Sequence, residues 1–220
     1  MTPPQPAVFS DIEGTLIRIS FPRTYFEQAR AMGLVPLVNL IQTGLLNVLG
    51  KPFSPKSKIG GILRYLAIMT AMRNMPISAN DGVMARVIPL LHAALKPKTI
   101  ARVREYEAQG MPVFLVSAAL QQGVELFASS LGWRGEGTRP IVKEGIFTGR
   151  AEKPLTGEEK AVRVREVAQK HNLDLSRSVG FGDTTSDVYF LSLLGSAFVV
   201  DPDDELRAIA AQKGWTIIES

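Results

Sequence analysis

The stretch Ala7-Val-Phe-Ser-Asp-Ile-Glu-Gly-Thr15 places two carboxylates directly after a short apolar run. An apolar run of this length, bounded by polar and glycine residues, predicts a buried β-strand over residues 7–10. The next strand pattern, Pro112-Val-Phe-Leu-Val-Ser117, lies far downstream, and from there helical and strand patterns alternate to the end of the chain. Such alternation, with fully apolar short strands, predicts an α/β fold: a doubly wound, mainly parallel sheet covered by helices on both faces.

The remaining elements follow from the same periodicities. Expected helices after residue 97 lie at 98–109, 120–131, 156–171, 186–194 and 203–212, and expected strands at 178–181, 197–200 and 215–218, with a hairpin at 141–147. Helical, proline-punctuated patterns fill the gap between the first two strands, at 25–32, 34–49, 59–75 and 81–95. We therefore expect a core formed by residues 1–19 and 97–220, with a helical domain of residues 20–96 inserted after the first strand.

The charges divide the chain in nearly the same place. Residues 16–100 contain eleven Lys and Arg against two acids, a net charge of +9, whereas the whole chain has +4, so the remainder has −5. A basic segment within an acidic remainder suggests that one part meets an anionic partner while the other holds a cation.

Composition excludes several classes of protein. With 45% hydrophobic and 21% charged residues the chain is expected to pack a core, and the absence of cysteine excludes disulfides, thiolate metal sites and cysteine nucleophiles. The first residues show no basic region followed by an apolar run, so no secretory signal is predicted and we expect a cytoplasmic protein. Nucleic acid is not an expected partner, because the basic segment lacks the interleaved aromatic residues of a single-strand platform.

The uncharged stretch of twenty residues from Ala31 to Gly50 has the length of a bilayer span. It also contains Pro36, several amide side chains and three glycines, so two packed helical segments are the favoured interpretation. Peripheral contact with an anionic membrane stays open as a second interpretation. The cations that flank the stretch are Arg23, Arg30, Lys51, Lys56 and Lys58.

Polar side chains gather where the predicted strands end, and binding sites of parallel sheets form at that edge. These residues are Asp11, Glu13, Ser117, Asp183 and Asp187, with Lys160 in the first turn of the helix expected after Thr156. Each has a structural alternative as a helix cap or loop residue. Lys160 is the least easily explained in that way, because cations are disfavoured near helix N-termini and Thr156 with Glu159 already predicts a capping box there.

With these motifs in this order, the sequence resembles the haloacid dehalogenase (HAD) superfamily of aspartyl phosphotransferases, in its phosphoserine-phosphatase-like branch (subfamily IB). The matching segments are Asp11-Ile-Glu-Gly-Thr15, Val113-Phe-Leu-Val-Ser117, Lys160 and Gly182-Asp183-Thr-Thr-Ser-Asp187. The likeness covers residues 7–19 and 97–220, whereas the insertion resembles that branch only in position and helicity, as a cap between the first and second motifs.

The resemblance implies a Rossmann-like core and a Mg²⁺-dependent phosphomonoesterase. Asp11 would attack phosphorus to form an aspartyl-phosphate, and Glu13 would act as general acid and base. Ser117 and Lys160 would bind phosphate oxygens. Mg²⁺ would be held by Asp11, the Glu13 backbone carbonyl, Asp183 and Asp187.

Two departures bear on activity and substrate. Glu13 stands where the family's phosphatases usually have Asp, so a catalytically weak or inactive protein that binds a phosphorylated ligand is the alternative. Phosphoserine phosphatases of this branch have an acidic residue shortly after the first motif, whereas Leu16-Ile-Arg-Ile-Ser-Phe-Pro-Arg23 offers only cations. Phosphoserine is therefore ranked low. A lipid-type or other anionic phosphomonoester is one hypothesis for the substrate, and a small sugar or polyol phosphate is its alternative.

Overall fold

The computed structural model describes residues 3–50, 52 and 58–220, which form two compact units. The core unit comprises Met1–Ser20, Ile88–Thr138 and Lys153–Ser220, and the inserted unit comprises Phe21–Val87 and Arg139–Glu152. These bounds differ from the predicted insertion of residues 20–96 at two places. Residues 88–96 group with the core unit, and the hairpin segment 139–152, expected in the core, groups with the insertion.

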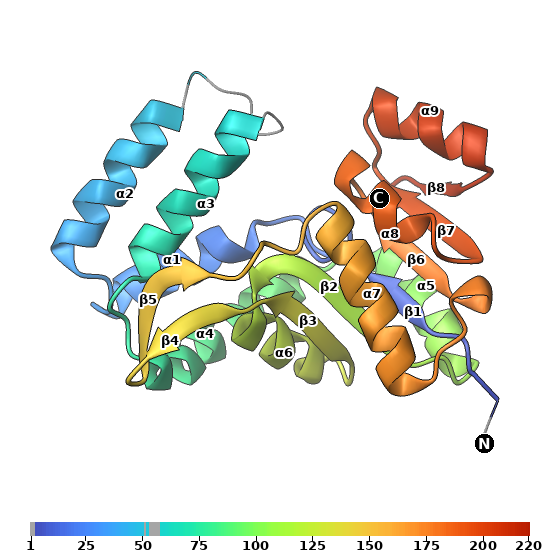
Figure 1. Ribbon diagram of the computed structural model, residues 1–220, viewed down its shortest axis with the longest axis horizontal. Coiled ribbons are helices and arrows are strands. Elements are labelled where there is room, and N and C mark those ends of the chain that lie inside the picture. Colours follow the sequence, from blue (N-terminus) through green and yellow to red (C-terminus); the bar gives the residue numbers. More distant parts are fainter. Residues whose placement is uncertain (1–2, 51, 53–57) are drawn as a thin grey trace. The chain divides into compact units, whose positions relative to one another are not determined.

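One six-stranded parallel sheet forms the centre of the core unit (Figure 1). Its order is β3-β2-β1-β6-β7-β8, so the first strand of the chain lies in the middle. The strands are β1 (Val8–Ser10), β2 (Val113–Leu120), β3 (Arg134–Thr138), β6 (Val179–Gly182), β7 (Ser196–Val200) and β8 (Thr216–Ile218). The predicted α/β class with a mainly parallel sheet is confirmed.

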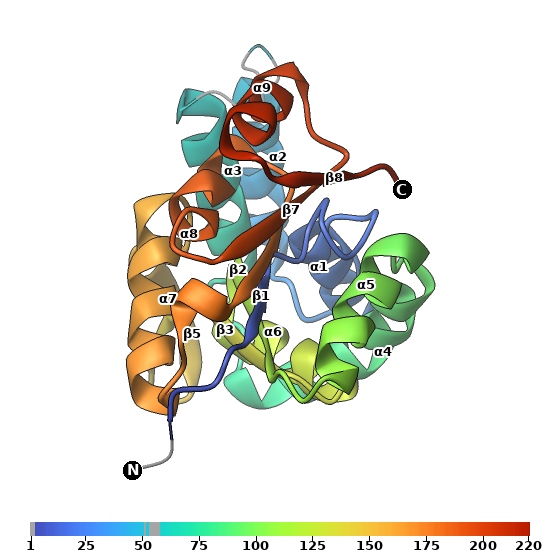
Figure 2. The ribbon, with the colours of Figure 1, turned by 90° about the vertical axis from the view of Figure 1, so that its right-hand side faces the viewer.

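Helices cover both faces of this sheet, which Figure 2 shows nearly edge-on. They are α5 (Pro97–Ala108), α6 (Gln121–Ser130), α7 (Glu158–His171), α8 (Val188–Leu191) and α9 (Asp204–Lys213), and α4 (Asn80–Ala93) ends in this unit. Phe9 and Phe114 stack at 5.5 Å within the core that α7, α8 and α9 cover. Tyr106 of α5 meets Phe181 and Phe198 on the opposite face. Alternate strand residues thus supply two separate cores.

Strand β3 was not predicted, because its sequence Arg-Gly-Glu-Gly-Thr has no apolar pattern. Its glycines allow close approach instead: a Cβ at Gly135 would lie 2.7 Å from the Val124 carbonyl oxygen, and one at Gly137 would lie 2.7 Å from that of Ala119. The predicted helix 186–194 is also shorter, with a 3₁₀ turn at Thr185–Asp187 followed by α8.

The described part of the inserted unit contains helices and one hairpin. Its helices are α1 (Phe21–Ala31), α2 (Leu37–Gly50), α3 (Lys58–Met72), a 3₁₀ turn (Ile77–Ala79) and the first half of α4. Strands β4 (Pro140–Lys143) and β5 (Ile146–Ala151) pair around Glu144 and Gly145, both at positive φ, which confirms the predicted hairpin.

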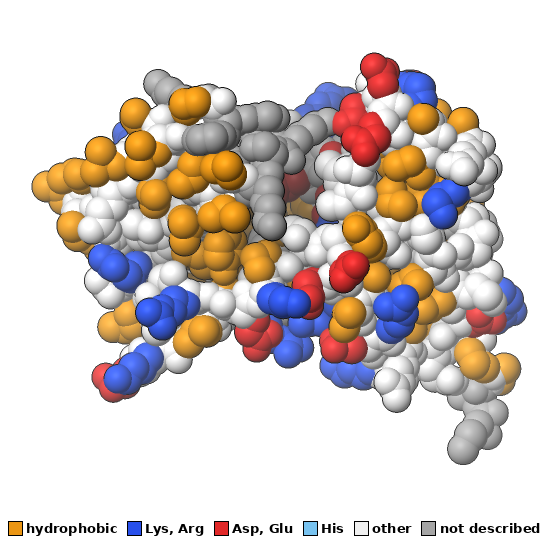
Figure 3. All heavy atoms as spheres, turned by 45° about the horizontal axis from the view of Figure 1, so that its top comes forward, with side chains coloured by type: hydrophobic (Ala, Val, Ile, Leu, Met, Phe, Trp, Pro, Cys, Tyr) orange, Lys and Arg blue, Asp and Glu red, His pale blue; other side chains and the backbone are white. Residues whose placement is uncertain are grey.

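Many large apolar side chains of α2 and α3 are exposed (Figure 3). None of the described helices is both long and apolar enough to span a bilayer. Lys51 and Lys56, which were predicted to flank the uncharged stretch, lie outside the described residues.

Candidate active site

The register of the sheet brings the predicted site segments to one edge. Ser10 at the end of β1 pairs with Leu115 of β2 and with Phe181 of β6. Asp11 directly follows Ser10, and Ser117 and Asp183 each lie two residues beyond the partner of Ser10 on their own strand. Chain segments that are more than a hundred residues apart meet here because parallel strands end at the same edge of the sheet.

A buried ammonium group lies between two carboxylates at this edge. Lys160 Nζ lies 2.6 Å from Asp11 Oδ1 and 2.6 Å from Asp187 Oδ1, and all three side chains are at most 10% exposed. Burial opposes the charge on Lys160, but the two carboxylates outweigh it and raise the pKa of the ammonium group above its ordinary value. Burial likewise raises the pKa of Asp11, an effect that the Lys160 charge opposes. Lys160 therefore favours the ionised form of Asp11.

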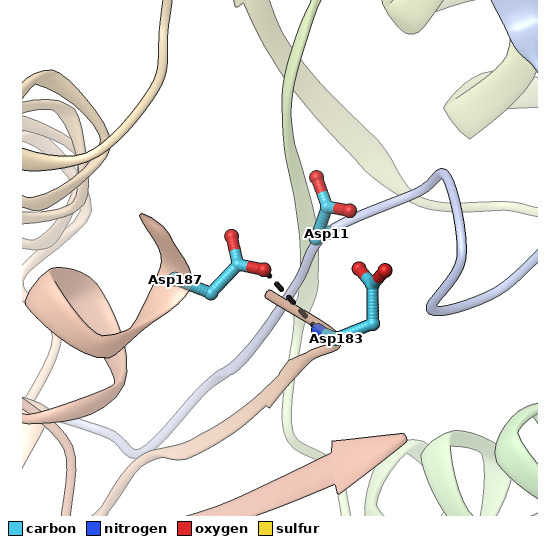
Figure 4. Close-up of side chains that lie close together, drawn as sticks. All are labelled: Asp11, Asp183 and Asp187. Atoms are coloured by element: carbon cyan, nitrogen blue, oxygen red, sulfur yellow. Dashed lines mark hydrogen bonds between the residues drawn. The ribbon is translucent and has the colours of Figure 1, made fainter. Parts of the chain in front are cut away.

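The second oxygen of Asp187 fixes the loop after β6. Asp187 Oδ2 accepts hydrogen bonds from the backbone N–H groups of Asp183 (3.2 Å) and Thr184 (3.0 Å) and from the Thr184 hydroxyl (2.9 Å). Figure 4 shows Asp187 reaching the main chain of Asp183 in this way. Asp187 thus links Lys160 to the segment that presents Asp183.

Asp11, Asp183 and Asp187 form a group of three carboxylates, each with an oxygen within 4.8 Å of the others (Figure 4). Burial and the charges of Asp11 and Asp187 raise the pKa of Asp183 to about 8. Three crowded carboxylates against one ammonium group leave an excess of negative charge, and hard oxygen donors are the ligands that Mg²⁺ prefers. The residues present therefore fit a divalent cation.

Two further predicted residues lie at the same edge. Ser117 is 1% exposed, and its Oγ accepts a hydrogen bond from the Ala119 N–H at 3.1 Å. Glu13 is half-buried, and its carboxylate is not among the three grouped oxygens.

The capping box predicted at Thr156 and Glu159 is wrong. Helix α7 is capped by Gly157 at a φ of 54° without a side-chain hydrogen bond, and Glu159 pairs with Lys153 at 2.6 Å. Lys160 is nevertheless explained, as predicted, by negative neighbours.

Two residues near the Asp11 loop were missed by sequence reasoning. Thr15 is fully buried, and its hydroxyl lies 2.8 Å from Asp183 Oδ1 and 3.5 Å from Asp11 Oδ2. Its position four residues after Asp11, in the same motif, was an available signal. Lys96 donates to the Gly14 carbonyl oxygen and pairs with Asp201 at 2.7 Å. Nothing in the sequence distinguished Lys96 from the other cations of the basic segment.

Gly14 is a tightly constrained position in the site. It adopts a φ of 75°, and a Cβ built there would lie 2.0 Å from Asp183 Oδ2. We expect Gly14→Ala to displace the Asp183 carboxylate and to lower kcat/KM about 100-fold, the scale of loss that follows a 1 Å misplacement of reacting groups. Steady-state kinetics with an aryl phosphate measures this loss.

Gly110→Ala is the matched control, because Gly110 also has a positive φ (86°) but an added Cβ would meet no atom within 4 Å. Both variants incur the backbone strain of about 1–2 kcal/mol for an alanine in this region. Only Gly14→Ala should lose activity. Equal kinetic losses in the two variants would show that backbone strain, and not displacement of Asp183, is responsible.

Comparisons with known proteins agree with this arrangement. The sequence model of the haloacid dehalogenase-like hydrolases matches residues 8–192. An "inhibition of morphological differentiation protein" of Streptomyces azureus is 27% identical over 98% of this chain and 79% of its own length. Phosphoserine phosphatase SerB1 of Mycobacterium tuberculosis is 38% identical over 49% of this chain and 36% of its own length.

A solved phosphoserine phosphatase with bound substrate has the same fold, with a TM-score of 0.66 at 18% identity over 100% of this chain and 95% of that one. The family match spans most of the sequence and includes Asp11, Ser117, Lys160, Asp183 and Asp187. The chain therefore belongs to the haloacid dehalogenase-like hydrolases.

Proposed function

We propose that this protein hydrolyses phosphomonoesters through a covalent phosphate ester of Asp11, with Mg²⁺ as cofactor. The observation that supports this most directly is the buried Asp11–Lys160–Asp187 contact beside Asp183. It combines a carboxylate held ready to attack, a fixed cation and a group of oxygens suited to a divalent ion.

In the first half of the reaction, an oxygen of Asp11 attacks phosphorus while the bond from phosphorus to the leaving oxygen breaks. Glu13, two residues further along the same loop, donates its proton to that oxygen and releases the alcohol. The Ser117 hydroxyl and the Lys160 ammonium group hold the phosphate oxygens. Asp11, the Glu13 carbonyl and Asp183 would hold Mg²⁺, together with Asp187, and the ion would supply positive charge that lets the phosphate and Asp11 approach each other.

In the second half, Glu13 takes a proton from water, whose oxygen attacks the same phosphorus. The bond to Asp11 breaks, inorganic phosphate leaves, and Glu13 is again protonated for the next ester. Glutamate provides the same acid–base chemistry as aspartate with one more methylene, so we propose that Glu13 sustains both transfers.

The substrate that we propose is an anionic phosphomonoester with an apolar portion, such as a single-chain lipid phosphate. Leu16 to Arg23 contains cations and no acid that could hold a substrate amine, and residues 28–80 have six Lys and Arg and no Asp or Glu. These features support an anionic ligand over phosphoserine, and the exposed apolar side chains of α2 and α3 support an apolar portion. The cytoplasmic location stays a prediction.

The proposal is tested by phosphate release from an aryl phosphate, with and without Mg²⁺, followed by a panel of phosphomonoesters. We expect release to stop with a chelator and to return when Mg²⁺ is added back. In the panel, kcat/KM for a single-chain lipid phosphate in detergent should exceed that for phosphoserine at least about tenfold, which corresponds to 1.4 kcal/mol. No release from any phosphate would favour the alternative, a protein that binds a phosphorylated ligand without turnover.

A further inference from the structure

Helix α2 exposes most of its large apolar side chains and buries two of its polar ones. Its buried side chains are Asn39 and Thr43, which donate to the carbonyl oxygens of Arg73 (2.6 Å) and Ala67 (3.3 Å). Its exposed large hydrophobic side chains, from 51% to 72% accessible, are Leu37, Val38, Ile41, Leu45, Val48 and Leu49. A helix that faces water normally shows the opposite arrangement.

These exposed residues form one stripe. At 100° per residue, the six positions fall within an arc of about 120° around the helix axis. The neighbouring α3 adds Ile59, Ile62 and Leu66, spaced i, i+3 and i+7 and 43–53% exposed. We call these nine side chains the α2–α3 face.

The α2–α3 face is an unusual concentration of apolar surface. It holds nine of the fourteen large hydrophobic side chains that are exposed among the described residues. Figure 3 shows hydrophobic side chains gathered over the part of the surface that α2 and α3 occupy. Contiguous exposed apolar patches of this kind mark contact with a membrane or another macromolecule.

The charge of the inserted unit indicates which kind of partner the α2–α3 face contacts. The segment 28–80, which includes the face, has six Lys and Arg and no Asp or Glu. The inserted unit as a whole has eleven basic against four acidic residues, a net +7, whereas the core unit has a net −3. A second copy of the chain would bring this positive unit against its equal, whereas a membrane with anionic lipids pairs with both the charge and the apolar stripe.

Exposed cations lie in the same unit. Arg30, near the end of α1, is exposed. Arg73, just after α3, is also exposed and donates to Gln42 of α2 at 3.4 Å. Apolar residues on one side of a helix with cations around it are the pattern of segments that lie in the membrane interface.

We propose that the α2–α3 face rests on the surface of anionic membranes and holds the protein there peripherally. Leu45, Leu49 and their neighbours enter the headgroup boundary, and the surrounding Lys and Arg side chains contact lipid phosphates. The attachment is independent of the proposed hydrolysis, because it requires neither Asp11 nor a substrate.

The test is flotation of the purified full-length chain with vesicles of phosphatidylcholine alone or mixed with phosphatidylglycerol. We expect binding to the anionic vesicles at least about tenfold tighter than to the neutral ones, weakened by high salt. The double variant Leu45→Ser, Leu49→Ser should lower the affinity for anionic vesicles at least about tenfold, because two exposed leucines no longer enter the boundary.

Leu90→Ser is the matched control, since Leu90 is also exposed, at 42%, but lies in the core unit. It should bind as the unchanged protein does, and circular dichroism should show the same fold for all variants. Failure of the unchanged protein to float with anionic vesicles would overturn the proposal. So would binding that the double variant retains, or a dimer that the double variant dissociates when no vesicle binding is seen. In each case the phosphatase assay is unaffected, so the two proposals fail separately.

Discussion

Asp11→Asn is expected to lower kcat at least about 1000-fold while the protein stays folded, because an amide cannot attack phosphorus and the loss of a nucleophile removes the covalent route entirely. The side chain keeps its shape, and Lys160 keeps its contact with Asp187 at 2.6 Å. Burial raises the pKa of Asp11, so its ionised form disfavours folding once the pH exceeds the ordinary aspartate value. The neutral Asn should therefore leave the unfolding temperature at neutral pH unchanged or slightly higher.

The measurement combines steady-state kinetics with acid quenching of the enzyme during turnover of a labelled phosphomonoester. The unchanged protein should retain label that hydroxylamine releases, as expected of an acyl phosphate, and Asp11→Asn should retain none. Asp204→Asn, at an exposed position in the first turn of α9, is the matched control and should keep full activity. Label on Asp11→Asn, or a kcat above a tenth of the original, would place the nucleophile elsewhere.

The sequence was sufficient to locate the carboxylates because each follows an apolar strand. Asp11 and Asp183 could be placed together without coordinates, since parallel strands end at one edge of the sheet. Lys160 stood out because a cation in the first turn of a helix has no local stabilisation. In the structure, Lys160 contacts both Asp11 and Asp187, and Asp183 lies beside these two carboxylates.

What could not be predicted depends on packing between distant segments. Strand β3 is formed by a polar, glycine-rich sequence whose close approach to α6 and β2 leaves no room for a Cβ. Lys96 reaches the Gly14 carbonyl oxygen and Asp201, more than eighty residues away along the chain on either side. In the sequence it is one cation among many, and the predicted insertion wrongly included it. Contacts of this kind cannot be predicted from the local hydrophobic periodicity of the sequence.

The exposed face of α2 could not be predicted from the sequence for a different reason. Its stretch is uncharged throughout, so the sequence indicated a packed helix, and the burial of Asn39 and Thr43 could not be foreseen. Asn39 and Thr43 point inward because backbone carbonyl oxygens of Arg73 and Ala67 accept their hydrogen bonds. Only the positions of those acceptors determine which side of the helix faces outward.

Lys160→Met should have a large effect on both activity and stability. Removing one partner of a buried, hydrogen-bonded ion pair leaves the other uncompensated, at a cost of about 3–5 kcal/mol. Here two carboxylates, Asp11 and Asp187, lose their shared cation, and both are buried. We expect a clear drop in the unfolding temperature of the metal-free protein and a fall in kcat of at least about 100-fold, since the phosphate also loses its ammonium partner.

The pH dependence of this loss has a defined sign. The pKa of Lys160 is raised above its ordinary value of 10.5, so its stabilising contribution is fully present at any pH below that value and does not itself vary near neutrality. In the variant, Asp11 lacks the cation that opposes the effect of its burial, and its protonation at low pH relieves the cost. The difference in unfolding temperature between the two proteins should therefore be small near pH 4, grow as the pH rises and be largest above about pH 7.

Lys153→Met is the matched control, because Lys153 also pairs with a carboxylate at 2.6 Å, that of Glu159, but is 80% exposed. Exposed pairs contribute little, so this variant should unfold at the temperature of the unchanged protein across the same pH range and keep its activity. If Lys160→Met instead shifted the unfolding temperature no more than Lys153→Met, the buried contact would not hold Asp11 in its ionised form. The assignment of Lys160 as the cation that prepares Asp11 for attack would then have to be abandoned.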